Sequence, residues 1–129
     1  MRRAALGLAL SLCGARAAGA AAPVCAQAQA PAGDLEKEAN AAVDQAFKDF
    51  EAKKFREAGQ GFLRAYEMTG GQFPKQLRNA AKAYTTGALF EEAVQVWERL
   101  ANLPRADEAM RREAKEQLLA VRTLWSDQL

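Results

Sequence analysis

Histidine is absent from this chain, and cysteine is confined to its start. The 129 residues include no His, and the two cysteines, Cys13 and Cys25, both lie within residues 1–33. The rest of the chain therefore lacks the soft metal ligands, the thiol nucleophile and the imidazole base that many catalytic sites use. These absences predict a protein that is not an enzyme and that carries no metal and no cofactor.

Acidic residues are missing from residues 1–33, where three of the arginines stand. The whole chain has 18 Lys and Arg against 16 Asp and Glu, so subtracting those three leaves 15 against 16 and a net charge of −1. A near-neutral body lacks the excess of positive charge with which proteins hold nucleic acids. We therefore expect no nucleic-acid partner.

Residues 1–28 have the order of a secretory signal peptide. A basic start at Arg2 and Arg3 precedes an apolar run that ends near Cys13, and small residues follow. The sequence Ala26-Gln27-Ala28 offers small residues at the two positions that signal peptidase reads. We expect cleavage after Ala28, a linker over residues 29–34, and export to the periplasm.

Other interpretations of this leader stay open. Arg16 within an acid-free, Ala-rich segment is also typical of a mitochondrial transit peptide. A lipoprotein anchor fits less well, because Leu12 and Val24, rather than small residues, precede the two cysteines. The apolar run of about ten residues is shorter than the roughly 20 that span a bilayer. We expect no membrane span in the mature chain.

Apolar side chains after residue 34 recur every three or four positions, which is the period of a helix, and no stretch alternates as a surface strand does. Asp34 is the expected N-cap of the first helix, and Gly70-Gly71, Gly87 and Pro104 separate the later ones. The predicted helices cover about residues 35–53, 55–68, 74–87, 90–102 and 106–125.

Two stretches follow the same pattern, displaced by 35 residues. Each runs aromatic, small, aromatic, then small or apolar, at spacings of three, four and three. Self-similarity at such a period is typical of helical repeat proteins, which present surfaces for binding. The two copies are Phe55, Ala58, Phe62 and Ala65, and Phe90, Ala93, Trp97 and Leu100.

This pattern resembles the tetratricopeptide repeat (TPR) family, which packs a helix pair about every 34 residues. The resemblance covers two degenerate repeats, about 39–72 and 73–106, and a capping helix at about 106–126, within a domain of residues 35–129. It implies an all-α fold of helix-turn-helix repeats stacked as a short right-handed α-solenoid. The matching repeat positions are Ala46, Phe55, Ala58, Phe62, Ala65, Leu77, Ala81, Tyr84, Phe90, Ala93 and Trp97.

The sequence departs from the family pattern in several places. Asp49 stands where an aromatic is usual, Leu100 replaces a small residue, Gly70 replaces the terminal proline, and Pro104 comes one position early. An unrelated bundle of helical hairpins is the alternative. Because arrays of this kind generally need three units, self-association or membership of a larger complex is a further expectation.

A basic face on the third predicted helix is the main candidate for binding. Lys75, Arg78 and Lys82 share one face, with Asn79 beside them. In the TPR family such positions face the concave groove, and the matching sites on the first helix are Val43, Phe47 and Phe50, together with Asn40. An ordinary solvated face is the alternative.

Other chemical motifs are weak. The carboxylates Glu91-Glu92, Asp107-Glu108 and the Asp44/Asp49 pair have no recognisable catalytic partners, and Gly59-Gln60-Gly61 lies inside a predicted helix, where small residues permit close packing. The sequence thus predicts an exported, non-enzymatic adaptor whose groove holds a protein or peptide segment, with acidic groups as an expected feature of that partner. The alternative is a small accessory or structural subunit of a larger complex, mitochondrial or membrane-associated.

Overall fold

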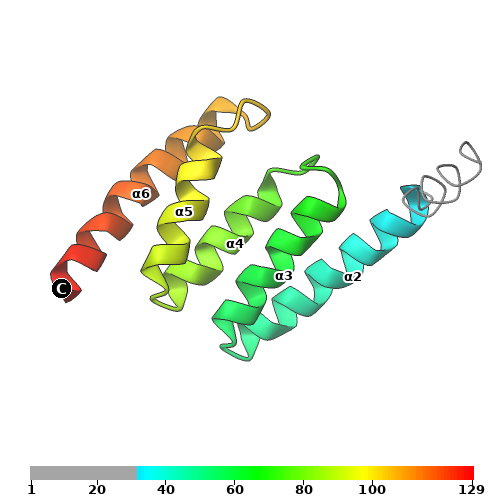
Figure 1. Cartoon of the computed structure of the whole chain (residues 1–129), viewed down its shortest axis with the longest axis horizontal. Coiled ribbons are helices and arrows are strands. Elements are labelled where there is room, and N and C mark those ends of the chain that lie inside the picture. Colours follow the sequence, from blue (N-terminus) through cyan, green and yellow to red (C-terminus); the bar gives the residue numbers. More distant parts are fainter. Residues whose placement is uncertain (1–31) are drawn as a thin grey trace, which may run out of the picture. The chain divides into compact units, whose positions relative to one another are not determined.

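The computed structural model describes residues 32–129, all of whose regular structure is helical. The expected leader of residues 1–28, its cleavage after Ala28 and the first residues of the expected linker lie outside this range. Residues 35–129 form one packed unit. The helices are α2 (Ala32–Glu51), α3 (Phe55–Met68), α4 (Lys75–Thr86), α5 (Phe90–Ala101) and α6 (Glu108–Gln128) (Figure 1).

The expected bounds of the first and last helices were wrong: α2 spans Ala32–Glu51 rather than 35–53, and α6 spans Glu108–Gln128 rather than 106–125. The first helix begins at Ala32 and not after Asp34, so Asp34 lies in its first turn instead of capping it. A carboxylate there still interacts favourably with the positive end of the helix dipole. The last helix begins at Glu108, because the side chain of Asp107 accepts a hydrogen bond of 2.7 Å from the Met110 amide and thereby caps it.

The helices α2, α3 and α4 end in the same way. A left-handed residue follows each of them, and the next amide donates to the carbonyl five residues earlier. Gly70, with φ of 65°, terminates α3, and the Gly71 amide donates to the Tyr66 carbonyl at 2.9 Å. The expected glycine stop is therefore confirmed. After α4 the left-handed residue is Ala88, with φ of 57°, and not Gly87, whose φ is −84°.

We expect Ala88→Gly to stabilise the protein by about 0.5–1 kcal/mol, because only glycine adopts this backbone conformation without steric cost. Thermal unfolding followed by circular dichroism should show a rise of about 3–6 °C. The same change at Ala120, exposed in the interior of α6, should instead lower stability by about 1 kcal/mol. A loss of stability at Ala88 would contradict the left-handed assignment.

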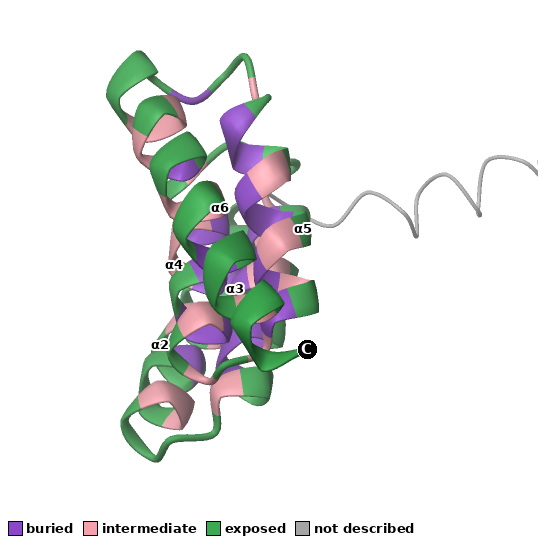
Figure 2. Cartoon of the chain, turned by 90° about the vertical axis from the view of Figure 1, so that its left-hand side faces the viewer, coloured by how far each residue is buried: buried purple, intermediate pink, exposed green. Residues whose placement is uncertain are grey.

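The helices pack against their neighbours in chain order. α3 packs on α4, α4 on α5, and α5 on α6. α2 contacts α3 through the edge-to-face pair of Phe47 and Phe62, whose ring centroids lie 4.9 Å apart. Figure 2 shows that the buried residues line the sides on which the helices meet.

Small residues set these close approaches. Gly59 and Gly61 are both buried within α3. A Cβ at Gly61 would lie 3.0 Å from Ala46 of α2, and one at Gly59 would overlap the Tyr84 ring of α4. The interpretation of this Gly-X-Gly segment as a packing feature is confirmed.

The core runs through every described helix. Its largest fully buried side chains are Trp97, Phe62, Leu77, Leu100 and Val121. All of the repeat positions assigned from sequence are buried except Phe55, which is half-buried. On α6, Ala114 and Val121 are buried, while Met110, Leu118 and Trp125 pack against the core from its edge.

Candidate functional site

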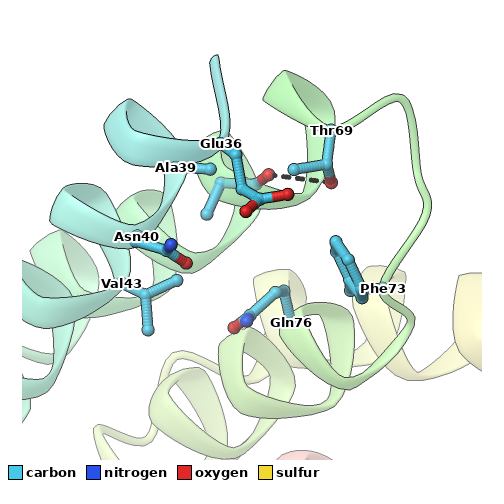
Figure 3. Close-up of a pocket in the computed structure, with 8 residues that line it drawn as sticks. Glu36, Ala39, Asn40, Val43, Thr69, Phe73 and Gln76 are labelled. Carbon is cyan, nitrogen blue, oxygen red and sulfur yellow. Dashed lines mark hydrogen bonds between the residues drawn. The ribbon is translucent and has the colours of Figure 1, made fainter. Parts of the chain in front are cut away.

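Two hollows lie along the surface between α2 and α4, and together we call them the α2–α4 groove. The larger, the Phe73 pocket, measures about 220 Å³ (Figure 3). The smaller, the Phe47 pocket, measures about 140 Å³. The Phe73 pocket is lined by Glu36, Ala39, Asn40, Val43, Ala65, Thr69, Phe73 and Gln76, and the Phe47 pocket by Phe47, Phe50, Phe62, Asn79 and Lys82.

The structure brings together most of the candidate binding residues named from sequence. Phe47, Phe50, Asn79 and Lys82 line the Phe47 pocket, and Val43 lines the Phe73 pocket. Arg78 instead lines a separate hollow with Met110 and Glu113, next to α6, and Lys75 is an exposed residue that lines none of these three hollows. The residues thus divide between two sides of α4.

The aromatic wall of the Phe47 pocket is held by two ring–ring contacts. The rings of Phe47 and Phe62 meet edge to face, and the rings of Phe50 and Phe55 do the same with centroids 5.2 Å apart. Phe47 nevertheless keeps 48% of its surface exposed. Because each ring is held by a second ring from α3, the wall is preformed for an apolar side chain.

The basic face of α4 is partly neutralised from within the molecule. Arg78 Nε and Nη2 donate to the two carboxylate oxygens of Glu113 on α6, at 2.6 and 3.2 Å. Lys82 Nζ lies 4.0 Å from the same carboxylate. Arg78 therefore joins α4 to α6, and Lys82 is the cation that reaches the groove.

Glu113 was missed by the sequence interpretation, although the repeat contains a signal for it. Glu113 lies 35 residues after Arg78, which is the displacement between the two repeat copies. Other polar contacts join residues about one repeat apart: Arg56 pairs with Glu92, Arg99 with Glu67 at 3.2 Å, and Arg105 donates to the Gly71 carbonyl at 2.9 Å. Opposite charges at this displacement could have indicated these pairs.

Three of the six carboxylates considered as catalytic groups have structural partners. Asp107 caps α6, and Asp49 accepts a hydrogen bond of 3.0 Å from Gln45. The hydrogen bond from Arg56 lowers the pKa of Glu92, so this carboxyl stays ionised near neutral pH. Burial raises the pKa of the nearby Tyr84 hydroxyl, which stays protonated.

In the described part of the chain, no cluster of three or more His, Cys, Asp or Glu residues is placed to hold a metal ion. None of the described helices combines the length and the apolar character needed to cross a membrane.

Comparison with family models, with curated proteins and with solved structures finds no match to this chain.

Proposed function

We propose that this protein is a non-enzymatic interaction module that holds a segment of a partner protein in the α2–α4 groove. The observation that carries the proposal is the pair of half-exposed aromatic rings along one groove, Phe47 at 48% and Phe73 at 41% exposed. Removing apolar surface from water favours association. Aromatic side chains in preformed hollows are also typical of the residues that dominate binding.

The proposed architecture is that of two TPR-like repeats, α2–α3 and α4–α5, with α6 as the capping helix of a short right-handed α-solenoid. Support comes from the contacts between residues one repeat apart and from the glycines that let successive helices approach. In such an array the first helix of each pair lines the groove. In the proposed repeats α2 and α4 are the first helices of their pairs, so they are the helices that line the groove.

The expected partner segment carries an apolar anchor for the Phe47 pocket and an acidic group near Lys82. Exposed ion pairs contribute only about 0–1 kcal/mol each. Most of the affinity therefore comes from the aromatic wall, while Lys82 orients the partner and the positive charge of the exposed Lys75 speeds its association. Arg78 has a different role in this proposal, because Glu113 already occupies its guanidinium.

The proposed compartment is the periplasm, reached through the leader of residues 1–28, with mitochondrial import as the alternative. The second candidate function is an accessory subunit of a larger assembly. The observation that favours it lies on α6, where Leu119 is 67% and Leu124 is 49% exposed. A subunit would dock through these leucines rather than through the groove.

Affinity capture from the native cell, read by quantitative mass spectrometry, tests the two candidates with matched variants. Phe47→Ala removes one aromatic pair and the burial of about half a side chain, so it should lower stability by about 2 kcal/mol and leave the protein folded. We expect it to reduce recovery of the partner about tenfold, as for the loss of a central anchor. Leu119→Ala should leave recovery unchanged.

The opposite pattern, with recovery lost on changing Leu119 and kept on changing Phe47, would favour the subunit. Neutralising Lys75 and Lys82 to Gln should weaken capture about two- to fivefold at low salt and less at high salt. Arg78 is left intact in this test, because its removal would unpair Glu113 and loosen α6.

A further inference from the structure

One polar side chain in the Phe73 pocket is buried more completely than its hydrogen bonds explain. Gln76 keeps only 8% of its surface exposed. Its Oε1 accepts a hydrogen bond of 3.2 Å from Asn79 Nδ2, while its Nε2 donates to no group within residues 32–129. Figure 3 shows the amide of Gln76 directed from α4 toward α2, into the pocket. Since buried polar groups are nearly always hydrogen-bonded, this donor calls for an acceptor.

The opposite side of the same pocket carries a second polar group, the Glu36 carboxylate, which can accept a hydrogen bond from an occupant. Glu36 is the sole charged residue of its lining, and the carboxylate reaches across the opening toward Thr69 (Figure 3). Glu36 pairs with no cation in the described part of the chain. Thr69 itself is already engaged, because its hydroxyl lies 3.3 and 3.1 Å from the carbonyls of Ala65 and Tyr66.

The group that complements this pocket must accept from Gln76 and donate to Glu36. A carboxamide does both through two separate atoms of one planar unit, whereas a hydroxyl must donate and accept through a single oxygen. A carboxylate would be repelled by Glu36, an ammonium or guanidinium has no acceptor for Gln76, and an aliphatic side chain would leave the amide unsatisfied. Ala39, Val43 and Phe73 provide apolar walls for the methylene groups of such a side chain.

The size of the pocket limits the occupant to one side chain. Its volume of about 220 Å³ is below the roughly 300–1,000 Å³ of sites that hold drug-sized molecules. Along α2, Asn40 of the Phe73 pocket precedes Phe47 of the Phe47 pocket by seven residues, which at 1.5 Å per residue is about 10 Å. Two turns of a helix, or three residues of an extended chain, bridge that distance.

We propose that the Phe73 pocket selects a glutamine or asparagine side chain, carried about 10 Å from the apolar anchor that fills the Phe47 pocket. This inference rests on the proposed function and adds the specificity of the groove. In this proposal Gln76 and Glu36 determine which side chain binds. Gln76 donates a hydrogen bond to the carboxamide oxygen, and Glu36 accepts one from the carboxamide nitrogen.

Selection of short random peptides displayed on phage, with the full chain as bait, tests the specificity. Peptides whose capture Phe47→Ala abolishes are the groove occupants, and we expect Gln or Asn to be enriched at one fixed distance from an apolar residue. For a synthetic peptide of this group, replacing its glutamine by leucine should raise Kd about tenfold. Replacement by glutamate should raise Kd at least as much.

A variant without the Glu36 charge distinguishes specific recognition of the carboxamide from simple filling of the pocket. Glu36→Gln removes the repulsion, so the peptide with glutamate should recover most of its affinity on this variant. Glu38→Gln, an exposed change on the same helix outside the pocket, should not restore it. The Gln76 side-chain amide resonances should shift with the glutamine peptide and not with the leucine peptide.

Two results are decisive against the proposal, and they are distinguishable. Groove peptides without enrichment of Gln or Asn, or with a Kd that changes less than about twofold on the leucine replacement, would overturn the carboxamide specificity and leave the groove in place. Recovery of no peptide that depends on Phe47 would defeat the proposed function itself, and this inference with it.

Discussion

Trp97→Ala should cost about 3–5 kcal/mol of unfolding free energy, which is the range for deleting a buried aromatic side chain. Trp97 is 1% exposed and is the largest fully buried side chain in the described structure. Its indole Nε1 also donates to the Thr85 hydroxyl at 3.0 Å, which donates in turn to the Ala81 carbonyl at 2.8 Å. The substitution therefore leaves a cavity between α4 and α5 and removes a hydrogen bond.

Circular dichroism melts and urea titrations measure this effect. In a domain of this size about 1 kcal/mol shifts Tm by 4–8 °C, so a fall of more than about 12 °C is expected. Trp125→Ala, at the half-buried edge of α6, serves as a matched control with a smaller loss. An unchanged melt for Trp97→Ala would mean that this side chain does not fill the core.

Gly87→Ala should destabilise the protein by about 1–3 kcal/mol, although glycine-to-alanine changes usually do the reverse. The φ of −84° at Gly87 suits any residue, so the backbone itself is not the obstacle. The obstacle is Phe55 at the start of α3, whose Cβ would lie 2.5 Å from the new methyl group. Because a Cβ cannot rotate away, α3 would have to move relative to the α4–α5 turn.

The sign of this effect is the useful observation. Without the contact to Phe55, the loss of unfolded-state entropy would raise stability by about 0.4–1 kcal/mol. A urea titration of Gly87→Ala beside Ala88→Gly therefore compares adjacent positions with opposite expected outcomes. A gain at Gly87 would show that α3 and the α4–α5 turn lie further apart than the 2.5 Å approach to Phe55 implies.

The helical period and the glycine stops were sufficient to predict the helices themselves. The bounds of α3 agree with the expected ones, because Phe55 opens an apolar stripe and Gly70 ends it. The predicted start of α6 was wrong because Asp107 is a stronger cap than the preceding residues. A cap depends on one side-chain hydrogen bond, which the helical period does not indicate. The left-handed Ala88 has no signal in the sequence, since alanine ordinarily favours a helix.

The candidate site was predictable only in part. Phe47, Phe50 and Lys82 could be assigned because large apolar or basic residues at helical spacing mark a face. Gln76 and Glu36 could not, since a polar residue on a helix is ordinarily solvated, and their role depends on α2 and α4 lining the same pocket. The pairing of Arg78 with Glu113 has a signal only in the 35-residue repeat displacement, and no pattern within a single helix specifies it.

Binding in the groove should also affect how readily α2 unfolds locally. The described contacts of α2 include those with α3, through Phe47, Phe50 and Ala46, and α2 is the first helix of the packed unit. End helices open locally at a lower free energy than central ones. A segment bound across the groove would hold α2 to α4 as well, so part of its binding energy would appear as slower amide hydrogen exchange in α2. Affinity for the partner and the local stability of this helix are thus linked, and a substitution that frays α2 would weaken binding without touching the groove.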